Sequence, residues 1–201
     1  RLSLSKKFVN TYLKTDGSRF TDIDRYDTLQ FYQEITGRDA RLKQTIRGND
    51  YRRTDNSLAL PDFAVTTTGY HILKFSLDDK YFDTRGECFN SIPIIRYAEV
   101  LLNYAEAKAE LGTFTQTDWD NTIKALRARA GIANAAMPAM ADTYLQQNFF
   151  PDVTDAVLLE VRRERGIELA AEGFRYDDMK RWKTADHLQN AYVGMYVPAK
   201  G

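Results

Sequence analysis

Residues 96–111 read RYAEVLLNYAEAKAEL, and their hydrophobic side chains recur at the three- and four-residue spacing of an α-helix. Gly112 follows directly, and a glycine commonly ends a helix. The spacing predicts one inward apolar face, made of these residues: Tyr97, Val100, Leu101, Tyr104, Ala105 and Ala109. The stretch therefore predicts a helix that packs against the rest of the chain along one side.

The sequence downstream predicts further helices. A second helix is expected over residues 118–130, with Trp119, Ile123 and Leu126 facing inward and Gly131 ending it. Residues 96–129 thus approach the repeat length of roughly 34 residues of a tetratricopeptide helix pair. Thr154 is expected to cap a third helix reaching about residue 172, and residues 177–187 to form another helix or turn. The apolar positions of the third helix are Val157, Leu158, Val161 and Leu169.

The first half of the chain is less regular. Residues 5–13 predict a short helix, residues 28–35 a weak one, residues 41–47 extended chain, and residues 69–77 a strand, because apolar and polar side chains alternate there. Residues 133–153 read as an ordered connection. The expected fold is mainly α: tetratricopeptide-like helix pairs packed against an irregular, loop-rich region with few short strands. We expect one domain portion over residues 1–201, with residues 1–92 loop-rich and ligand-facing and residues 93–190 helical.

Composition limits the classes of function. Lys plus Arg and Asp plus Glu both number 28, so the net charge is zero and nucleic acid is not an expected partner. No apolar run has the length of about 18 residues that a membrane span requires. Cys88 is the only cysteine, is expected to be a small packed side chain, and cannot form an internal disulfide. His71 and His187 are the only histidines, so we expect neither a metal site nor histidine-based catalysis, and no cofactor.

The most unusual stretch is residues 162–175, RRERGIELAAEGFR, where charges continue an apolar helical stripe. We expect a structural ion network made of Arg162, Arg165, Glu168, Glu172, Arg175 and Arg181. The alternative is that Glu168 and Glu172 are a catalytic pair, as glycoside hydrolysis requires of two carboxyl groups. The arginines argue against it, because nearby guanidinium groups keep carboxylates ionised, whereas one member of an acid/base pair needs a raised pKa.

Three segments resemble the SusD/RagB family. Residues 96–107 (RYAEVLLNYAEA) resemble its first signature helix, residues 126–131 (LRARAG) its R-x-R-A-G segment, and residues 161–182 (VRRERGIELAAEGFRYDDMKRW) its second signature. Weaker similarities are residues 38–41, RDAR where the family usually has Arg-Asp-Pro-Arg, and Thr68-Gly69-Tyr70 followed by Lys74-Phe75. The three long motifs occur in the order that the family has them.

This resemblance implies a lipid-anchored protein on the extracellular face of a bacterial outer membrane, and not an enzyme. Such a protein captures a glycan, an oligosaccharide or polysaccharide and in some members a peptide, and passes it to a TonB-dependent, SusC-like transporter. Contact with the membrane would be only through a lipid anchor. The resemblance also implies that both ends of the chain are truncated, because family members usually begin with a lipoprotein signal and several helices that are absent here and usually continue past the point corresponding to Gly201.

Aromatic side chains in the irregular region are the expected ligand-binding residues. Sugar rings stack on exposed aromatics, and binding residues concentrate on loops, which favours Tyr26, Phe31, Tyr32 and Tyr51. Trp119 and Trp182 are expected in the core. A calcium site at Asp22, Asp24 and Asp27 is disfavoured because the calcium loop's glycine and final glutamate are missing. Two other functions remain open: a helical-repeat adaptor that binds peptides or proteins, and a hydrolase that uses Glu168 and Glu172.

Overall fold

A computed structural model describes residues 2–83, 89–189 and 191–198, so Cys88 lies outside the described residues. Helices dominate the described chain, and its only strand-like pairings are isolated bridges. The fold is therefore mainly α, as the sequence predicted. The α-helices are α1 (Lys6–Val9), α2 (Phe31–Glu34), α3 (Ala40–Thr45), α4 (Tyr97–Glu110), α5 (Gln116–Asn121), α6 (Ile123–Arg129), α7 (Thr143–Asn148), α8 (Ala156–Glu168) and α9 (Arg175–Arg181). Short 3₁₀ turns lie at Phe20–Asp22, Tyr26–Thr28, Lys80–Phe82 and Ala185–Gln189.

Two expectations for the first half were wrong. Residues 41–47, expected to be extended, lie largely in α3, because the side chain of Asp39 accepts a hydrogen bond from the backbone N–H of Arg41 and caps the helix. The strand expected over residues 69–77 does not form. Only His71 and Ile72 make isolated bridges there, and positive φ angles at Gly69 (86°) and Phe75 (65°) interrupt the extended backbone.

Helix α4 forms where the sequence predicted it, and the predicted inward residues Ala105 and Ala109 are buried, but the predicted tyrosines are not. Ala98, Leu102 and Ala105 are buried, whereas Tyr97 is 74% exposed and Tyr104 48% exposed. The small side chains let the backbone of α4 approach α8 closely, which places the alanine face, not the aromatic face, in the core.

The boundaries of the other helices differ from the sequence prediction in detail. The helix expected over residues 118–130 is divided into α5 and α6 at Thr122, and its predicted inward residues, Trp119, Ile123 and Leu126, are buried. Asp155, not Thr154, caps α8. Helix α8 ends at Glu168, and a turn with positive φ at Gly173 leads into α9. Helix α7 lies in the segment expected to be only a connection.

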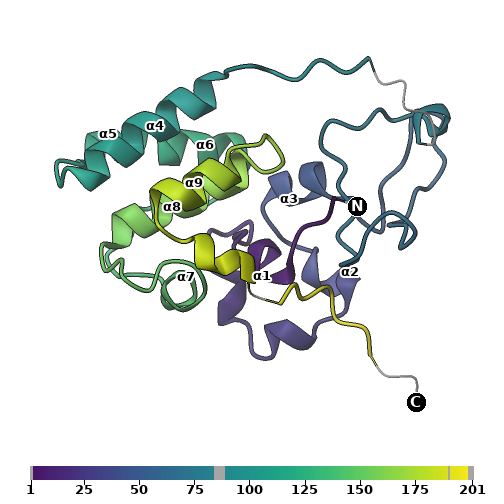
Figure 1. The fold of residues 1–201 in the computed structure, drawn as a ribbon, viewed down its shortest axis with the longest axis horizontal. Coiled ribbons are helices and arrows are strands. Elements are labelled where there is room, and N and C mark those ends of the chain that lie inside the picture. Colours follow the sequence, from purple (N-terminus) through teal and green to yellow (C-terminus); the bar gives the residue numbers. More distant parts are fainter. Residues whose placement is uncertain (1, 84–88, 190, 199–201) are drawn as a thin grey trace.

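Helix α8 joins the two halves of the molecule (Figure 1). Val161 packs with Leu102, Trp119 and Ile123 in the core cluster of the helical part. Ile167, less than two turns further on, packs with a second cluster from the loop-rich part that includes Tyr12, Leu42 and Tyr70. Both apolar clusters therefore meet on one helix, which fixes the loop-rich part against the helix pairs. None of the helices in the described ranges is both long and apolar enough to cross a membrane.

Candidate functional site

Charged side chains are unusually well buried on α8. Ten of its 13 residues are buried, among them Glu160, Glu164 and Glu168. A spacing of four residues places these three side chains on one face of the helix, and Glu172 continues the spacing into the following turn. We call Glu160, Glu164, Glu168 and Glu172 the glutamate ladder.

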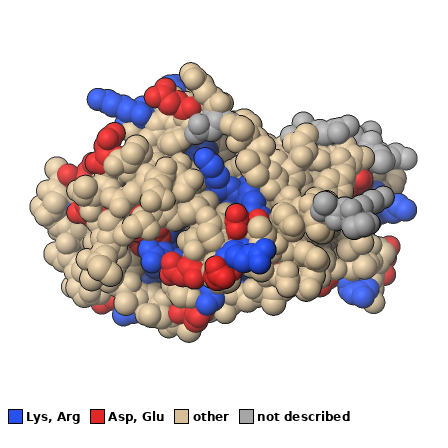
Figure 2. Space-filling view, turned by 90° about the horizontal axis from the view of Figure 1, so that it is seen from below, with Lys and Arg blue, Asp and Glu red and all other residues tan. Residues whose placement is uncertain are grey.

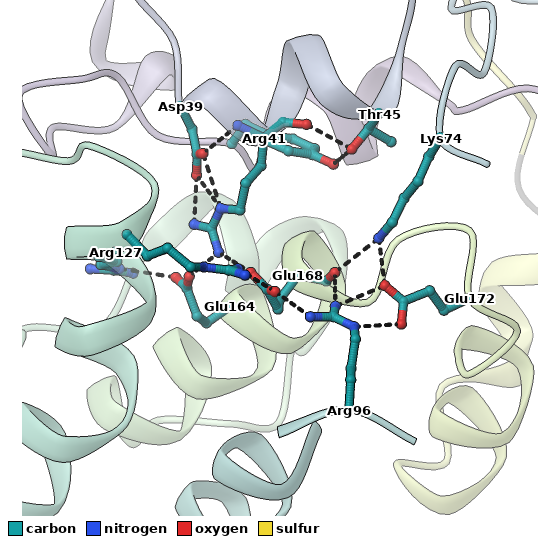
Figure 3. A network of polar contacts seen from close by, with 11 residues as sticks. Asp39, Arg41, Thr45, Lys74, Arg96, Arg127, Glu164, Glu168 and Glu172 are labelled. Carbon is teal, nitrogen blue, oxygen red and sulfur yellow. Dashed lines mark hydrogen bonds and ion pairs between the residues drawn. The ribbon is translucent and has the colours of Figure 1, made fainter. Parts of the chain in front are cut away.

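Cations from distant segments pair with the glutamate ladder (Figure 3). Arg127 of α6 bonds Glu160 and Glu164, with its Nε 3.0 Å from Glu164 Oε2. The guanidinium of Arg41 in α3 contacts Glu164 Oε1 at 2.5 Å and Glu168 Oε2 at 2.9 Å, and its Nη2 lies 2.6 Å from Asp39. Each of these arginines therefore joins two carboxylates of the glutamate ladder, which locks α3 and α6 onto α8.

The outer end of the ladder is held in the same manner. Arg96, just before α4, places Nη1 2.6 Å from Glu168 Oε1 and Nη2 2.7 Å from Glu172 Oε1. Lys74 Nζ is 2.5 Å from the same Glu172 oxygen, and Arg129 pairs with Glu168. Figure 3 shows Lys74 from the loop-rich part and Arg96 from the helical part converging beside Glu168 and Glu172.

These contacts set the protonation of Glu168 and Glu172. Burial by itself would raise the pKa of Glu168, but hydrogen bonds from Arg96 and Arg41 outweigh it and lower the pKa to about 2. Burial also opposes ionisation of Glu172, and hydrogen bonds from Arg96 and Lys74 again leave its pKa below the usual value. Both carboxylates therefore remain ionised at neutral pH, which does not suit a general acid.

Glu168 and Glu172 do line a cavity, of about 260 Å³, but three arginines line it with them: Arg41, Arg96 and Arg129. An open cavity without guanidinium groups would have favoured the hydrolase reading. The structure instead gives each carboxylate at least two cationic partners. The pair is thus built to hold helices together, and its oxygens are already occupied.

A second group of ion pairs ties α4, α8 and α9. Arg165 Nε lies 2.8 Å from Asp178 Oδ2, and Arg181 bonds both Asp178 and Glu106, with its Nη1 2.6 Å from Glu106 Oε1. The indole N–H of Trp182 also donates to Glu106. Trp182 is buried, as expected for a core residue.

The structure divides the ion network that the sequence predicted. Glu168 and Glu172 lie together, but their partners are Arg41, Arg96, Arg129 and Lys74, none of which was expected. The expected partners are elsewhere: Arg165 and Arg181 belong to the second group, and Arg162 pairs with Glu110 at 2.7 Å. Arg175 forms no ion pair with another described residue. The four-residue spacing of the glutamates was a visible signal for the missed members Glu160 and Glu164.

The aromatic residues expected to bind ligand have different surroundings. Tyr26 makes edge contacts with the rings of Phe20 and Tyr144, and Phe31 packs beside Tyr70. The hydroxyl of Tyr51 donates to Asp78. Tyr32 is the most open of the four, with 52% of its surface exposed on α2. None of the four lines the cavity beside Glu168 and Glu172.

Other site types find little support among the residues that the structure describes. No three His, Cys, Asp or Glu side chains there gather in a way that could hold a metal ion. Asp22 is paired with Arg19 at 3.0 Å, and His71 accepts a hydrogen bond from the backbone of Asp62. Figure 2 shows acidic and basic side chains next to one another on one face, without a broad area of one sign.

Comparison with known proteins places this geometry in a family. The model of the SusD family matches residues 1–196. A SusD-like carbohydrate binding protein from Bacteroides fragilis is 28% identical, with a TM-score of 0.66, and the match covers 99% of this chain and 41% of that one. A second SusD-like protein from the same organism has the same fold, with 21% identity, a TM-score of 0.66, and coverage of 92% and 37%. The chain thus spans about two fifths of the length of these structures. The search of curated proteins found no match. With a family model matching nearly its whole length, this chain belongs to the SusD family.

Proposed function

We propose that this chain is part of a surface nutrient-binding protein that captures an oligosaccharide or polysaccharide. One observation carries the proposal: a protein described as carbohydrate binding is 28% identical over 99% of this chain. Balanced charge is compatible with a neutral ligand, because no field of one sign would select an ionic one.

The proposed role is binding without catalysis. Of the carboxylates that the sequence suggested for hydrolysis, Glu168 is held ionised by three arginines and Glu172 by Arg96 and Lys74. Glycoside hydrolysis requires one carboxyl group that stays protonated near neutral pH and another that faces the sugar. Both requirements conflict with carboxylates that are paired and have lowered pKa values.

We assign the glycan contact to the loop-rich part, with Tyr32 as its first candidate. A tyrosine ring stacks on the C–H face of a sugar, and its hydroxyl accepts or donates hydrogen bonds. Tyr32 is accessible, whereas Phe31 beside it packs against the core through Tyr70. Tyr26 and Tyr51 are partly exposed and would serve as secondary contacts.

Calorimetry against a panel of polysaccharides tests this assignment. We expect one glycan to bind, and Tyr32→Ala to weaken that binding about tenfold while leaving the unfolding midpoint unchanged. Tyr176→Ala is the matched control, because Tyr176 is 60% exposed but lies on α9 in the helical part. Equal losses in both variants would refute the role of Tyr32, and release of reducing sugars from any glycan would refute the non-catalytic role.

The proposal has two further parts. The protein delivers the glycan to a TonB-dependent, SusC-like transporter, and a lipid attaches it to the extracellular face of the outer membrane. Family membership supports both parts. Co-purification of the natural full-length protein with such a transporter, together with labelling of intact cells by an impermeant reagent, tests both. A protein that intact cells shield from the reagent, or that binds peptides and no glycan, would favour the adaptor alternative.

A further inference from the structure

A second cavity, unrelated to the glutamate ladder, lies where the two ends of the described chain meet α8 and α9. Its volume is about 360 Å³, within the range of small-molecule pockets, which starts near 300 Å³. Residues 2–5 and Phe8 form one wall, and residues 187, 188, 191 and 192 form another. A backbone hydrogen bond of 2.8 Å from Lys6 N–H to the Val193 carbonyl joins the two walls. The cavity is therefore held from both sides.

Its lining is mostly apolar. Phe8, Phe149, Phe174, Leu169 and Tyr192 contribute ring and aliphatic carbon. Gly166 of α8 faces the same space: a β-carbon at that position would stand 3.3 Å from the ring of Phe8 and 3.9 Å from Arg175 Nη1. The missing side chain of Gly166 thus leaves room between an aromatic ring and a guanidinium.

The charges in this lining are not balanced. Arg165 and Asp178 pair with each other, at 2.8 Å. Arg175 has no hydrogen bond or ion pair with any other described residue, and it lies against the rings of Phe149 and Trp182, with distances to the ring centroids of 5.7 and 5.8 Å. Burial lowers the pKa of Arg175, an effect that the charge of Asp178 only partly opposes. A guanidinium has five N–H donors, and those of Arg175, a partly exposed residue, have no acceptor among the described residues.

We propose that this cavity is a binding site for a small organic carboxylate, with the apolar body of the ligand among the aromatic side chains and its carboxylate on Arg175. A carboxylate fits a guanidinium through two parallel hydrogen bonds, which no neutral group reproduces. Phe8 and Phe149 would contact an aliphatic or phenyl body. Lys7, also in the lining and without an ion pair among the described residues, adds positive charge. The ligand class differs from a neutral glycan, and the site shares no residue with the assignment of Tyr32.

Titration of the full chain with phenylbutyrate and with its neutral amide, phenylbutyramide, tests the proposal. We expect the acid to bind about tenfold more tightly than the amide, because a hydrogen-bonded ion pair is formed only with the acid. Arg175→Met keeps the length and apolar stem of the side chain and removes the charge. It should abolish the preference for the acid without lowering the unfolding midpoint, since the removed charge has no ion-pair partner among the described residues.

Gly166→Ala is a second, independent variant. Alanine favours a helix more than glycine does, so folding should be preserved, whereas the added methyl group enters the space between Phe8 and Arg175. Acid and amide should both bind several-fold more weakly to it. Equal affinity of the native chain for acid and amide, failure of both to bind, or an acid preference that survives Arg175→Met would each overturn the proposal. Unchanged binding to Gly166→Ala would also overturn it.

Discussion

Arg41 and Glu164 stand 123 positions apart in the sequence, yet Arg41 Nη1 lies 2.5 Å from Glu164 Oε1, and both side chains are buried. The contact joins α3 of the loop-rich part to α8 of the helical part. Arg41 also contacts Glu168 and Asp39, so a single guanidinium satisfies three carboxylates. Removing one partner of such a buried group strands the others, which costs more than the pair contributes when intact.

We predict that Glu164→Gln lowers the free energy of unfolding by about 3 to 5 kcal/mol. Glu164 is fully buried and pairs with both Arg41 and Arg127, so a neutral amide would take one of the counter-charges from each of two buried guanidinium groups. Urea unfolding followed by the fluorescence of Trp119 and Trp182 measures the change. Asp120→Asn, which affects an exposed pair with Lys124, is the control and should leave stability nearly unchanged. Equal effects of the two variants would contradict the prediction.

Stability should fall in acid because of Glu168. Its folded-state pKa, about 2, is below the value of 4.5 expected for the unfolded chain, so the unfolded state takes up its proton first. The stabilisation is fully present above pH 4.5 and is lost as the pH falls from there through about 2. The free energy of unfolding should fall by about 3 kcal/mol over this range, at roughly 1.4 kcal/mol for each pKa unit. Urea unfolding at stepped pH should show this slope, and Glu168→Gln should flatten it. If the free energy of unfolding of Glu168→Gln fell with pH as steeply as that of the native chain, the loss in acid could not be due to Glu168.

Glu34 should behave in the opposite way. It is fully buried, and burial raises its pKa despite the charge of Lys6 and hydrogen bonds of 2.8 and 2.9 Å from the Tyr70 hydroxyl. Because its folded-state pKa is raised, protonation favours the folded state, and ionisation as the pH rises through that pKa costs stability. Glu34→Gln should therefore change the free energy of unfolding at neutral pH by less than about 1 kcal/mol, since the amide still accepts from Tyr70. A loss as large as that expected for Glu164→Gln would contradict the raised pKa.

The sequence predicted the helices that carry strong periodicity and missed the features that depend on distant partners. Helix α4 could be located from its own residues, but which face is buried depends on α8, and Tyr97 and Tyr104 lie on the exposed side. Helix α3 was mistaken for extended chain because its six residues are too few to establish a period, and the Asp39 cap decides it.

The ion network illustrates the same limit. Glu168 and Glu172 were recognisable as buried charges because they continue an apolar stripe. Their partners Arg41 and Arg96 come from segments 127 and 72 positions away from Glu168, and local spacing carries no information about them. The chain-local arginines Arg162 and Arg181 point instead to Glu110 and Glu106. Of the features of this network, only the four-residue spacing of the glutamates could be recognised from the sequence alone.

A last prediction concerns Gly17, in the turn that meets residues 133–135. Its φ is 85°, and a β-carbon there would stand 2.0 Å from the carbonyl oxygen of Asn134, which is backbone and cannot rotate away. Gly37 also has a positive φ, 67°, but a β-carbon there meets nothing within 4 Å. Gly37→Ala should therefore cost only the strain of a left-handed residue, about 1 kcal/mol, and serves as the matched control. Gly17→Ala should cost that strain plus displacement of the Asn134 backbone, about 3 kcal/mol in total. Urea unfolding of both variants measures the difference, and equal losses would mean that the contact between this turn and residues 133–135 contributes nothing to holding the two parts together.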